Sequence, residues 1–130
     1  MSLWWQQLGL VMAGGALGAA GRFLIGGWLL RTVGTGFPWG TLAVNLLGSF
    51  AAGFLLVWLE GRGQSALLWR AFLMVGVLGA LTTYSALMLE LFLLQRSQGL
   101  SSAAGYLLLS LVAGIGLFWL GLRLATALRP

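Results

Sequence analysis

Four long apolar stretches cover nearly all of this 130-residue chain, and they decide what it can fold into. Hydrophobic residues make up 60% of the sequence and charged residues only 7%, which leaves too little polar surface to cover a soluble domain. A membrane-spanning helix needs about 20 apolar residues. We therefore predict an all-α membrane protein, a single domain of four transmembrane helices. The predicted spans have approximate boundaries at residues 4–30, 38–59, 66–94 and 101–125.

The tryptophans support this division of the chain. All of them lie near the predicted span ends, where aromatic side chains form a belt at the membrane surface. They are Trp4, Trp5, Trp28, Trp39, Trp58, Trp69 and Trp119. The N-terminal stretch, MSLWWQQLG, lacks the basic segment of a signal peptide. We therefore expect the first apolar stretch to be retained as a span.

Composition excludes several classes of function. The chain has no cysteine and no histidine, which removes disulfides, thiol chemistry and the usual transition-metal ligands. The short connections leave no room for a catalytic domain, so we do not expect an enzyme. The net charge of +5 comes from scattered arginines, which are more typical of interfacial anchors than of a nucleic-acid-binding patch.

Residues 75–90, VGVLGALTTYSALMLE, place an unusual group of polar residues inside the third predicted span. Gly76 and Gly79 precede the β-branched pair Thr82 and Thr83, a combination that favours a break near the middle of the helix. A break releases backbone carbonyls from their helical partners. Such backbone is tolerated at membrane depth mainly where it lines a cavity or a site. The stretch therefore indicates an ion-handling membrane protein.

Two further spans carry polar stripes. Thr41, Asn45 and Ser49 are four residues apart, so they share one face of the second span. Ser102, Tyr106 and Ser110 repeat this spacing in the fourth span, and their stripe could face the first. Such residues can line a pore, or they can hold neighbouring helices together through hydrogen bonds. We expect the first stripe to line a pore and leave both interpretations open for the second.

Arg22 and Glu90 are charged residues that fall within or near apolar stretches. Arg22 could extend its side chain to the membrane surface, or it could supply a fixed positive charge at the mouth of an anion path. Glu90 could be a neutralised or paired acid at the interface, or it could serve the function directly. The sequence does not decide either case.

The polar side chains of the spans favour an anion over a cation. Asparagine, threonine, serine and tyrosine can all donate hydrogen bonds, and acids are scarce. A small, strongly hydrated anion needs several donors to replace its water. The carbonyls released at a helix break have the opposite polarity and suit a hard cation such as sodium. The residues therefore predict a small anion channel or transporter with room for a structural cation.

The distribution of arginines gives only a weak signal for orientation. With a cytoplasmic N-terminus, the inner arginines would be Arg62, Arg70, Arg123 and Arg129, and the outer ones Arg22, Arg31 and Arg96. Such a small bias permits insertion in both directions. No internal repeat supplies two oppositely oriented halves, so an antiparallel, dual-topology dimer would be the equivalent arrangement.

Three segments resemble the Fluc/CrcB fluoride channel family: GGALGAAGRF (14–23), FPWGTLAVNLLGSFAAG (37–53) and GVLGALTTYSALMLE (76–90). The resemblance covers three of the four spans in the right order. It implies a fluoride-specific channel, multi-pass in the bacterial inner membrane, that exports toxic fluoride passively. It also implies an antiparallel dimer with two pores. The expected partners are the fluoride ion and the lipid bilayer, and no nucleic acid is expected to bind.

The resemblance also implies roles for individual residues. A structural sodium ion that is not transported would be held at the dimer interface by the backbone carbonyls of Gly79 and Thr82. Asn45 would match the pore-lining asparagine, Arg22 the first-span arginine, and Glu90 the acid that follows the threonine pair. The other candidates for the anion path are Thr41, Thr83, Tyr84, Ser85, Tyr106 and Ser110.

The chain departs from the family at an important place. The family pattern reads TTFSTF, whereas this chain reads TTYSAL, with Tyr84 at the first aromatic position, Ala86 in place of threonine, and Leu87 at the second aromatic position. A tyrosine ring keeps its positive edge and adds a hydroxyl, but leucine offers no aromatic edge. The chain could form a homodimer with an altered pore, or a heterodimer whose partner supplies the missing ring.

Two other classes of function compete with the channel. A small multidrug exporter coupled to protons would need an acid in the first span, which has none. A membrane scaffold without transport would use the polar stripes for packing alone. Replacement of Asn45 separates a pore from a scaffold, because a pore residue changes flux and a packing residue weakens the dimer.

Overall fold

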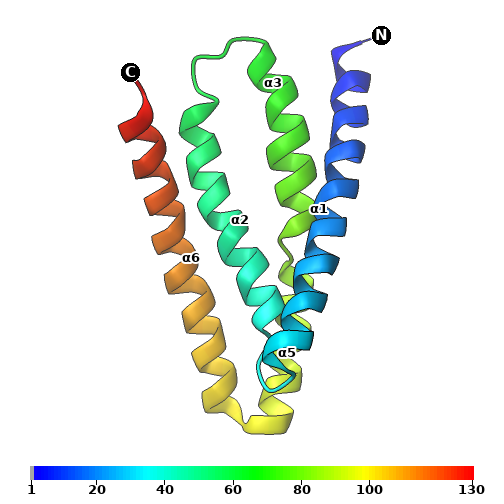
Figure 1. The fold of residues 1–130 in the computed structure, drawn as a ribbon, viewed down its shortest axis with the longest axis vertical. Helices are drawn as coiled ribbons and strands as arrows, with labels where there is room; N and C mark the ends of the chain where they lie inside the picture. Colours follow the sequence, from blue (N-terminus) through cyan, green and yellow to red (C-terminus); the bar gives the residue numbers. More distant parts are fainter. Residues whose placement is uncertain (1) are drawn as a thin grey trace.

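The computed structural model describes residues 2–130, and helices joined by short turns make up this part of the chain. The helices are α1 (Leu3–Val33), α2 (Trp39–Trp58), α3 (Ser65–Trp69), η1 (Arg70–Leu78), α4 (Gly79–Leu81), α5 (Tyr84–Gln98) and α6 (Leu100–Leu128). Elements α3 to α5 follow one another as a single, slightly bent span (Figure 1). Four segments are long and apolar enough to cross a membrane: Leu3–Val33, Trp39–Trp58, Ser65–Gln98 and Leu100–Leu128. The prediction of an all-helical chain with four candidate spans is confirmed.

The outer helices run a few residues past their predicted ends, to Val33 in α1 and Leu128 in α6. In both extensions a threonine hydroxyl donates a hydrogen bond to a carbonyl four residues earlier in the same helix. Thr32 Oγ1 donates to the Trp28 carbonyl at 2.9 Å, and Thr126 Oγ1 donates to the Leu122 carbonyl at 2.8 Å. A threonine that bonds four residues back remains compatible with a helix, so the helices continue beyond the apolar stretches.

The four spans alternate in direction, with α1 parallel to the third span and α2 parallel to α6 (Figure 1). The main contacts join α2 to α6 and α1 to η1. Gly53 of α2 lies against the Phe118 carbonyl, and Gly121 of α6 against the Phe50 carbonyl, so that a Cβ at either glycine would collide with an oxygen. Small residues permit such close backbone contact between helices in membranes.

Few large side chains are buried. One cluster joins Leu42, Leu87, Leu94 and Tyr106, and a second joins Val44, Leu78 and Leu81. Many other apolar side chains are exposed. Lipid tails are as apolar as leucine, so a span gains little by burying such side chains against protein. This exposure is what a membrane-spanning chain is expected to show.

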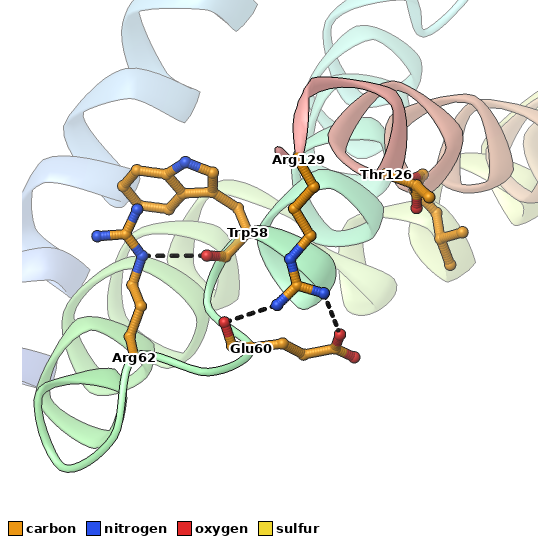
Figure 2. A network of polar contacts seen from close by, with 6 residues as sticks. Trp58, Glu60, Arg62, Thr126 and Arg129 are labelled. Carbon is orange, nitrogen blue, oxygen red and sulfur yellow. Dashed lines mark hydrogen bonds and ion pairs between the residues drawn. The ribbon is translucent and has the colours of Figure 1, made fainter.

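Two arginines hold the turn between α2 and α3: Arg129 from the C-terminal end of the chain, and Arg62 from the turn itself (Figure 2). Arg129 Nη1 lies 2.9 Å from Glu60 Oε2, and its Nη2 donates to the Glu60 carbonyl at 2.8 Å. Arg62 packs over the Trp58 ring, 3.8 Å from its centroid, and its Nε donates to the Trp58 carbonyl. These side chains lie at span ends, as expected for interfacial anchors.

Candidate functional site

The third span changes its helical form twice before its midpoint. Residues 70–78 form a π-helix, which the sequence did not predict. The helix is then interrupted at Thr82 (φ −84°, ψ 153°) and Thr83 (φ −148°, ψ 121°), which are both extended. The interruption lies within the region predicted for a break, yet the span as a whole bends only slightly (Figure 1). π-helical segments are rare and frequently lie at functional sites.

The interruption is held by side chains that replace missing backbone bonds. The Thr82 N–H and hydroxyl both donate to the Leu78 carbonyl, at 3.0 and 2.8 Å, which closes the first half of the span. Thr83 Oγ1 accepts from the Ala86 N–H at 3.2 Å and caps α5. Asn45 of α2 bonds the two backbone groups of Thr83: its Oδ1 accepts from the N–H at 2.7 Å, and its Nδ2 donates to the carbonyl at 3.1 Å. The two extended residues are therefore anchored from both sides.

Four backbone carbonyls, at residues 79–82, lose their usual donors at the interruption. The Ala80 carbonyl accepts instead from Arg22 Nε at 3.0 Å. Within residues 2–130, no hydrogen bond reaches the carbonyls of Gly79 and Thr82. Carbonyl oxygens without donors are the ligands that hard cations take. The chemistry of these two residues therefore fits the structural sodium that the family resemblance implies.

Helix α2 approaches the interruption closely because it has a glycine there. The Thr82 methyl group lies where a Cβ at Gly48 would stand. Gly48 is buried, and it is followed by Ser49, whose Oγ donates to the Asn45 carbonyl at 2.8 Å within the same helix. Any larger residue at position 48 would push the interrupted span away from Asn45.

A second polar cluster forms around Glu90. Thr41 Oγ1 donates to Glu90 Oε1 at 2.7 Å, and the Tyr106 hydroxyl donates to Glu90 Oε2 at 3.0 Å. Tyr106 is 1% exposed, and its ring makes an edge contact with Phe37, at 5.2 Å between centroids. Within the described residues the one ion pair joins Arg129 to Glu60, so Glu90 is bonded by hydroxyls rather than by a cation. The polar stripes of the second and fourth spans thus meet at one carboxylate.

Cavities lie beside both clusters. One of about 390 Å³ is lined by Thr41, Glu90 and the turn between α1 and α2, where Gln98 Nε2 donates to the Gly36 carbonyl at 2.6 Å. A second cavity, of about 410 Å³, lies at the interruption. Its lining includes five residues of interest: Asn45, Thr82, Thr83, Tyr84 and Leu87. The cavities place most of the predicted candidates beside open space.

A third cavity, of about 360 Å³, lies between α2 and α6 and is lined by Ser49 and Ser110. Ser110 Oγ is buried and has no hydrogen-bond partner within the described residues. Ser85 Oγ lies 3.3 Å from Thr83 Oγ1 on the exposed side of the interruption. Arg22, Ser85 and Tyr106 line none of these three cavities. Ser85 and Tyr106 each bond another candidate residue, whereas Arg22 bonds the Ala80 carbonyl, so the structure does not bring Arg22 together with the other candidates for the anion path.

The sequence indicated the residues at the interruption and around Glu90, but it did not predict two contacts between spans. The bidentate contact of Asn45 with Thr83 carries no local signal, since the two residues are 38 positions apart. The bond from Arg22 to Ala80 could not be foreseen for the same reason, as 58 positions separate them. Only the packing of three spans brings these groups into contact.

Four apolar spans, an interrupted third span and polar side chains that converge from three helices define a small membrane protein of the ion-channel or transporter class. A family model described as "CrcB-like protein, Camphor Resistance (CrcB)" matches residues 9–122. The chain therefore belongs to the CrcB-like family.

Relatives cover nearly the whole chain. A protein of Xylella fastidiosa (strain 9a5c) named fluoride-specific ion channel FluC is 52% identical over 122 residues, 94% of this chain and 85% of that protein. A protein of the same name from Xanthomonas euvesicatoria pv. vesicatoria (strain 85-10) is 54% identical over 121 residues, 93% of this chain and 91% of that protein. A third, from Agrobacterium fabrum (strain C58), is 42% identical over 118 residues, 91% and 94% of the two chains.

Proposed function

We propose that this chain forms a fluoride-specific channel in the bacterial inner membrane through which toxic fluoride leaves the cell passively. The names of the relatives support the ion. The observation that carries the proposal is the convergence of hydrogen-bond donors from the second and third spans on the cavities at the interruption and at Glu90, where Tyr106 of the fourth span bonds the carboxylate. A small, strongly hydrated anion can enter such a path only if donors replace its water.

The donors have defined tasks in this proposal. One of the two N–H groups of the Asn45 amide donates to the Thr83 carbonyl, and the other remains available to an anion. The hydroxyls of Thr41 and Tyr106 are held by the Glu90 carboxylate. Since fluoride and a carboxylate oxygen accept the same kind of bond, a passing fluoride would compete with Glu90 for these hydroxyls. Within residues 2–130 the hydroxyl of Ser110 has no competing partner.

We further propose that two copies associate as an antiparallel, dual-topology dimer. Gly79, Tyr84 and Ser85 are exposed near the middle of the third span, and Tyr84 is 75% exposed. Each unpaired polar group costs several kcal/mol in hydrocarbon, so protein rather than lipid should cover this surface. A second copy in the opposite orientation satisfies this need and agrees with the weak arginine bias. A homodimer is the simplest form, and a heterodimer with an aromatic residue opposite Leu87 is the alternative.

A structural sodium ion belongs to the same proposal. The carbonyls of Gly79 and Thr82 would bind it at the dimer interface, and the ion would supply positive charge there without being transported. Within residues 2–130 these two carbonyls accept no hydrogen bond, which supports this assignment.

The test is fluoride efflux from liposomes that contain the purified protein, read with a fluoride-selective electrode and compared with chloride efflux. Rapid fluoride release with little chloride release is the expected result. Release of both ions would show that the TTYSAL segment does not confer selectivity. Release of neither ion by a protein that remains folded would contradict the homodimeric channel, and co-expression with a second family member would then test the heterodimer.

A further inference from the structure

Arg22 bonds a backbone atom that the interruption has released. In a continuous helix the Ala80 carbonyl would accept from the Tyr84 N–H, four residues on. Because Thr82 and Thr83 are extended, this bond is lost. Arg22 Nε donates to the Ala80 carbonyl at 3.0 Å instead.

We propose that Arg22 is a positioning residue that caps the first half of the interrupted span through its Nε atom. In this role it is not a fixed charge that attracts the anion. The cap holds one of the four released carbonyls and leaves those of Gly79 and Thr82 free for a cation. The effect of the cap on conduction rests on the fluoride channel proposed above, but the cap itself does not.

The packing of α1 supports this assignment. Gly14, Gly18 and Arg22 are four residues apart and share one face of α1. A Cβ at Gly14 would collide with the Phe72 carbonyl, and a Cβ at Gly18 with the Val77 carbonyl. Helix α1 therefore follows the backbone of η1 closely, and the next position of the same face delivers Arg22 to the Ala80 carbonyl.

The depth of Arg22 also favours a local partner. Arg22 lies eight residues before Leu30, where the predicted apolar stretch ends, roughly 12 Å along the helix axis at 1.5 Å per residue. That distance is more than a third of the hydrocarbon thickness of a bilayer, which is about 30 Å. A guanidinium at this depth needs acceptors from protein, and the released carbonyl provides one.

Two substitutions separate a cap from a fixed charge, because the bond is made by Nε rather than by a terminal nitrogen. Glutamine places its side-chain nitrogen at the same number of bonds from Cα as arginine Nε, and it carries no charge. Lysine keeps the charge but has a methylene group at that place. Methionine lacks both the donor and the charge. The variants are therefore Arg22→Gln, Arg22→Lys and Arg22→Met.

The cap predicts that Arg22→Gln keeps fluoride efflux close to that of the parent protein. It predicts that Arg22→Lys and Arg22→Met lower efflux about tenfold, the factor expected from the loss of one good hydrogen bond. The opposite order, with efflux kept in Arg22→Lys and lost in Arg22→Gln, would overturn the proposal in favour of a fixed charge. Arg31, in the last turn of the same helix, provides a matched control, and its Gln and Lys variants should conduct alike.

A second measurement tests the cap without reference to conduction. Labelling alanine carbonyl carbons with ¹³C and leucine nitrogens with ¹⁵N selects the Ala–Leu peptide groups in solid-state NMR, including Ala80–Leu81. Leu81→Ile identifies this signal by removing it. The Ala80 carbonyl shift should be kept in Arg22→Gln and should move upfield in Arg22→Met.

An unchanged Ala80 carbonyl shift in Arg22→Met would overturn the cap, whatever the fluoride efflux. If the parent protein fails to conduct fluoride, the proposed function fails, while the NMR comparison still decides whether Arg22 caps the interrupted helix. The two proposals can therefore fail separately.

Discussion

The side chain of Asn45 serves the fold and the proposed path at once. It bonds the N–H of Thr83, which lost its helical partner when the third span was interrupted, and it adds a bond to the Thr83 carbonyl at the start of α5. Substitution of a pore residue usually lowers ion flux, whereas substitution of a residue that holds helices together usually lowers stability. Here both properties depend on the same amide group.

We therefore expect Asn45→Ala to lower both fluoride efflux and stability. Removal of the amide leaves the Thr83 N–H without a partner and removes one bond to the Thr83 carbonyl, at a cost of about 2–4 kcal/mol in the free energy of unfolding. Thermal unfolding in detergent and efflux from liposomes measure the two effects. Ser49→Ala is the matched control, because Ser49 bonds a carbonyl of its own helix and should have a smaller effect on stability. Unchanged stability in Asn45→Ala would contradict the contacts with Thr83.

Leu87 stands where the family resemblance implies a second aromatic residue. It is 8% exposed, packs with Leu42 and Tyr106, and also lines the cavity of about 410 Å³ at the interruption. We predict that Leu87→Phe preserves or raises fluoride efflux, because the cavity offers room for a ring and the ring edge is positive. Leu91→Phe is the control, because Leu91 packs against the same cluster and lines neither proposed cavity of the anion path. A clear loss of efflux in Leu87→Phe alone would count against the alignment of TTYSAL with TTFSTF.

At the scale of whole elements, the contact between α1 and η1 depends on the absence of side chains. Gly18 lies against the Val77 carbonyl, whereas a Cβ at Gly15 would meet nothing within 4 Å. The two glycines are less than one helical turn apart, but only one of them is needed for packing.

We expect Gly18→Ala to lower the free energy of unfolding by about 1–3 kcal/mol, because the added methyl group must push α1 away from η1. Gly15→Ala should be neutral or slightly stabilising, since alanine is the better helix former. Thermal unfolding of both variants checks this difference. Equal effects would mean that α1 does not pack on the third span through this face.

The sequence allowed the four spans and the place of the interruption to be predicted, because both depend on local properties. Apolar length defines the spans, and the pair Thr82 and Thr83 disfavours a continuous helix. The π-helix at residues 70–78 was missed, since the pattern of apolar residues there is that of any buried helix. All three of Glu90, Thr41 and Tyr106 were candidates, but their hydrogen bonds could not be predicted, because these depend on how three spans pack.

At the scale of the whole molecule, the proposed dimer and its sodium ion can be tested together. Fluoride efflux should be lost when sodium is replaced by a large organic cation on both sides of the membrane, because the carbonyls of Gly79 and Thr82 would then face each other without a bound cation. Restoring sodium should restore efflux. Unchanged efflux in sodium-free buffer would remove the sodium assignment, and a monomer in detergent that still conducts after reconstitution would question the dimer.

The two ends of the chain lie at the same end of the bundle, as follows from an even number of spans (Figure 1). A short flexible linker between two copies would therefore place both in the same orientation. A single-chain version of the proposed antiparallel dimer would need a fifth crossing of the bilayer between its halves. A gene that encoded such a duplication would have to acquire a new hydrophobic segment as it fused, which short loop insertions cannot supply.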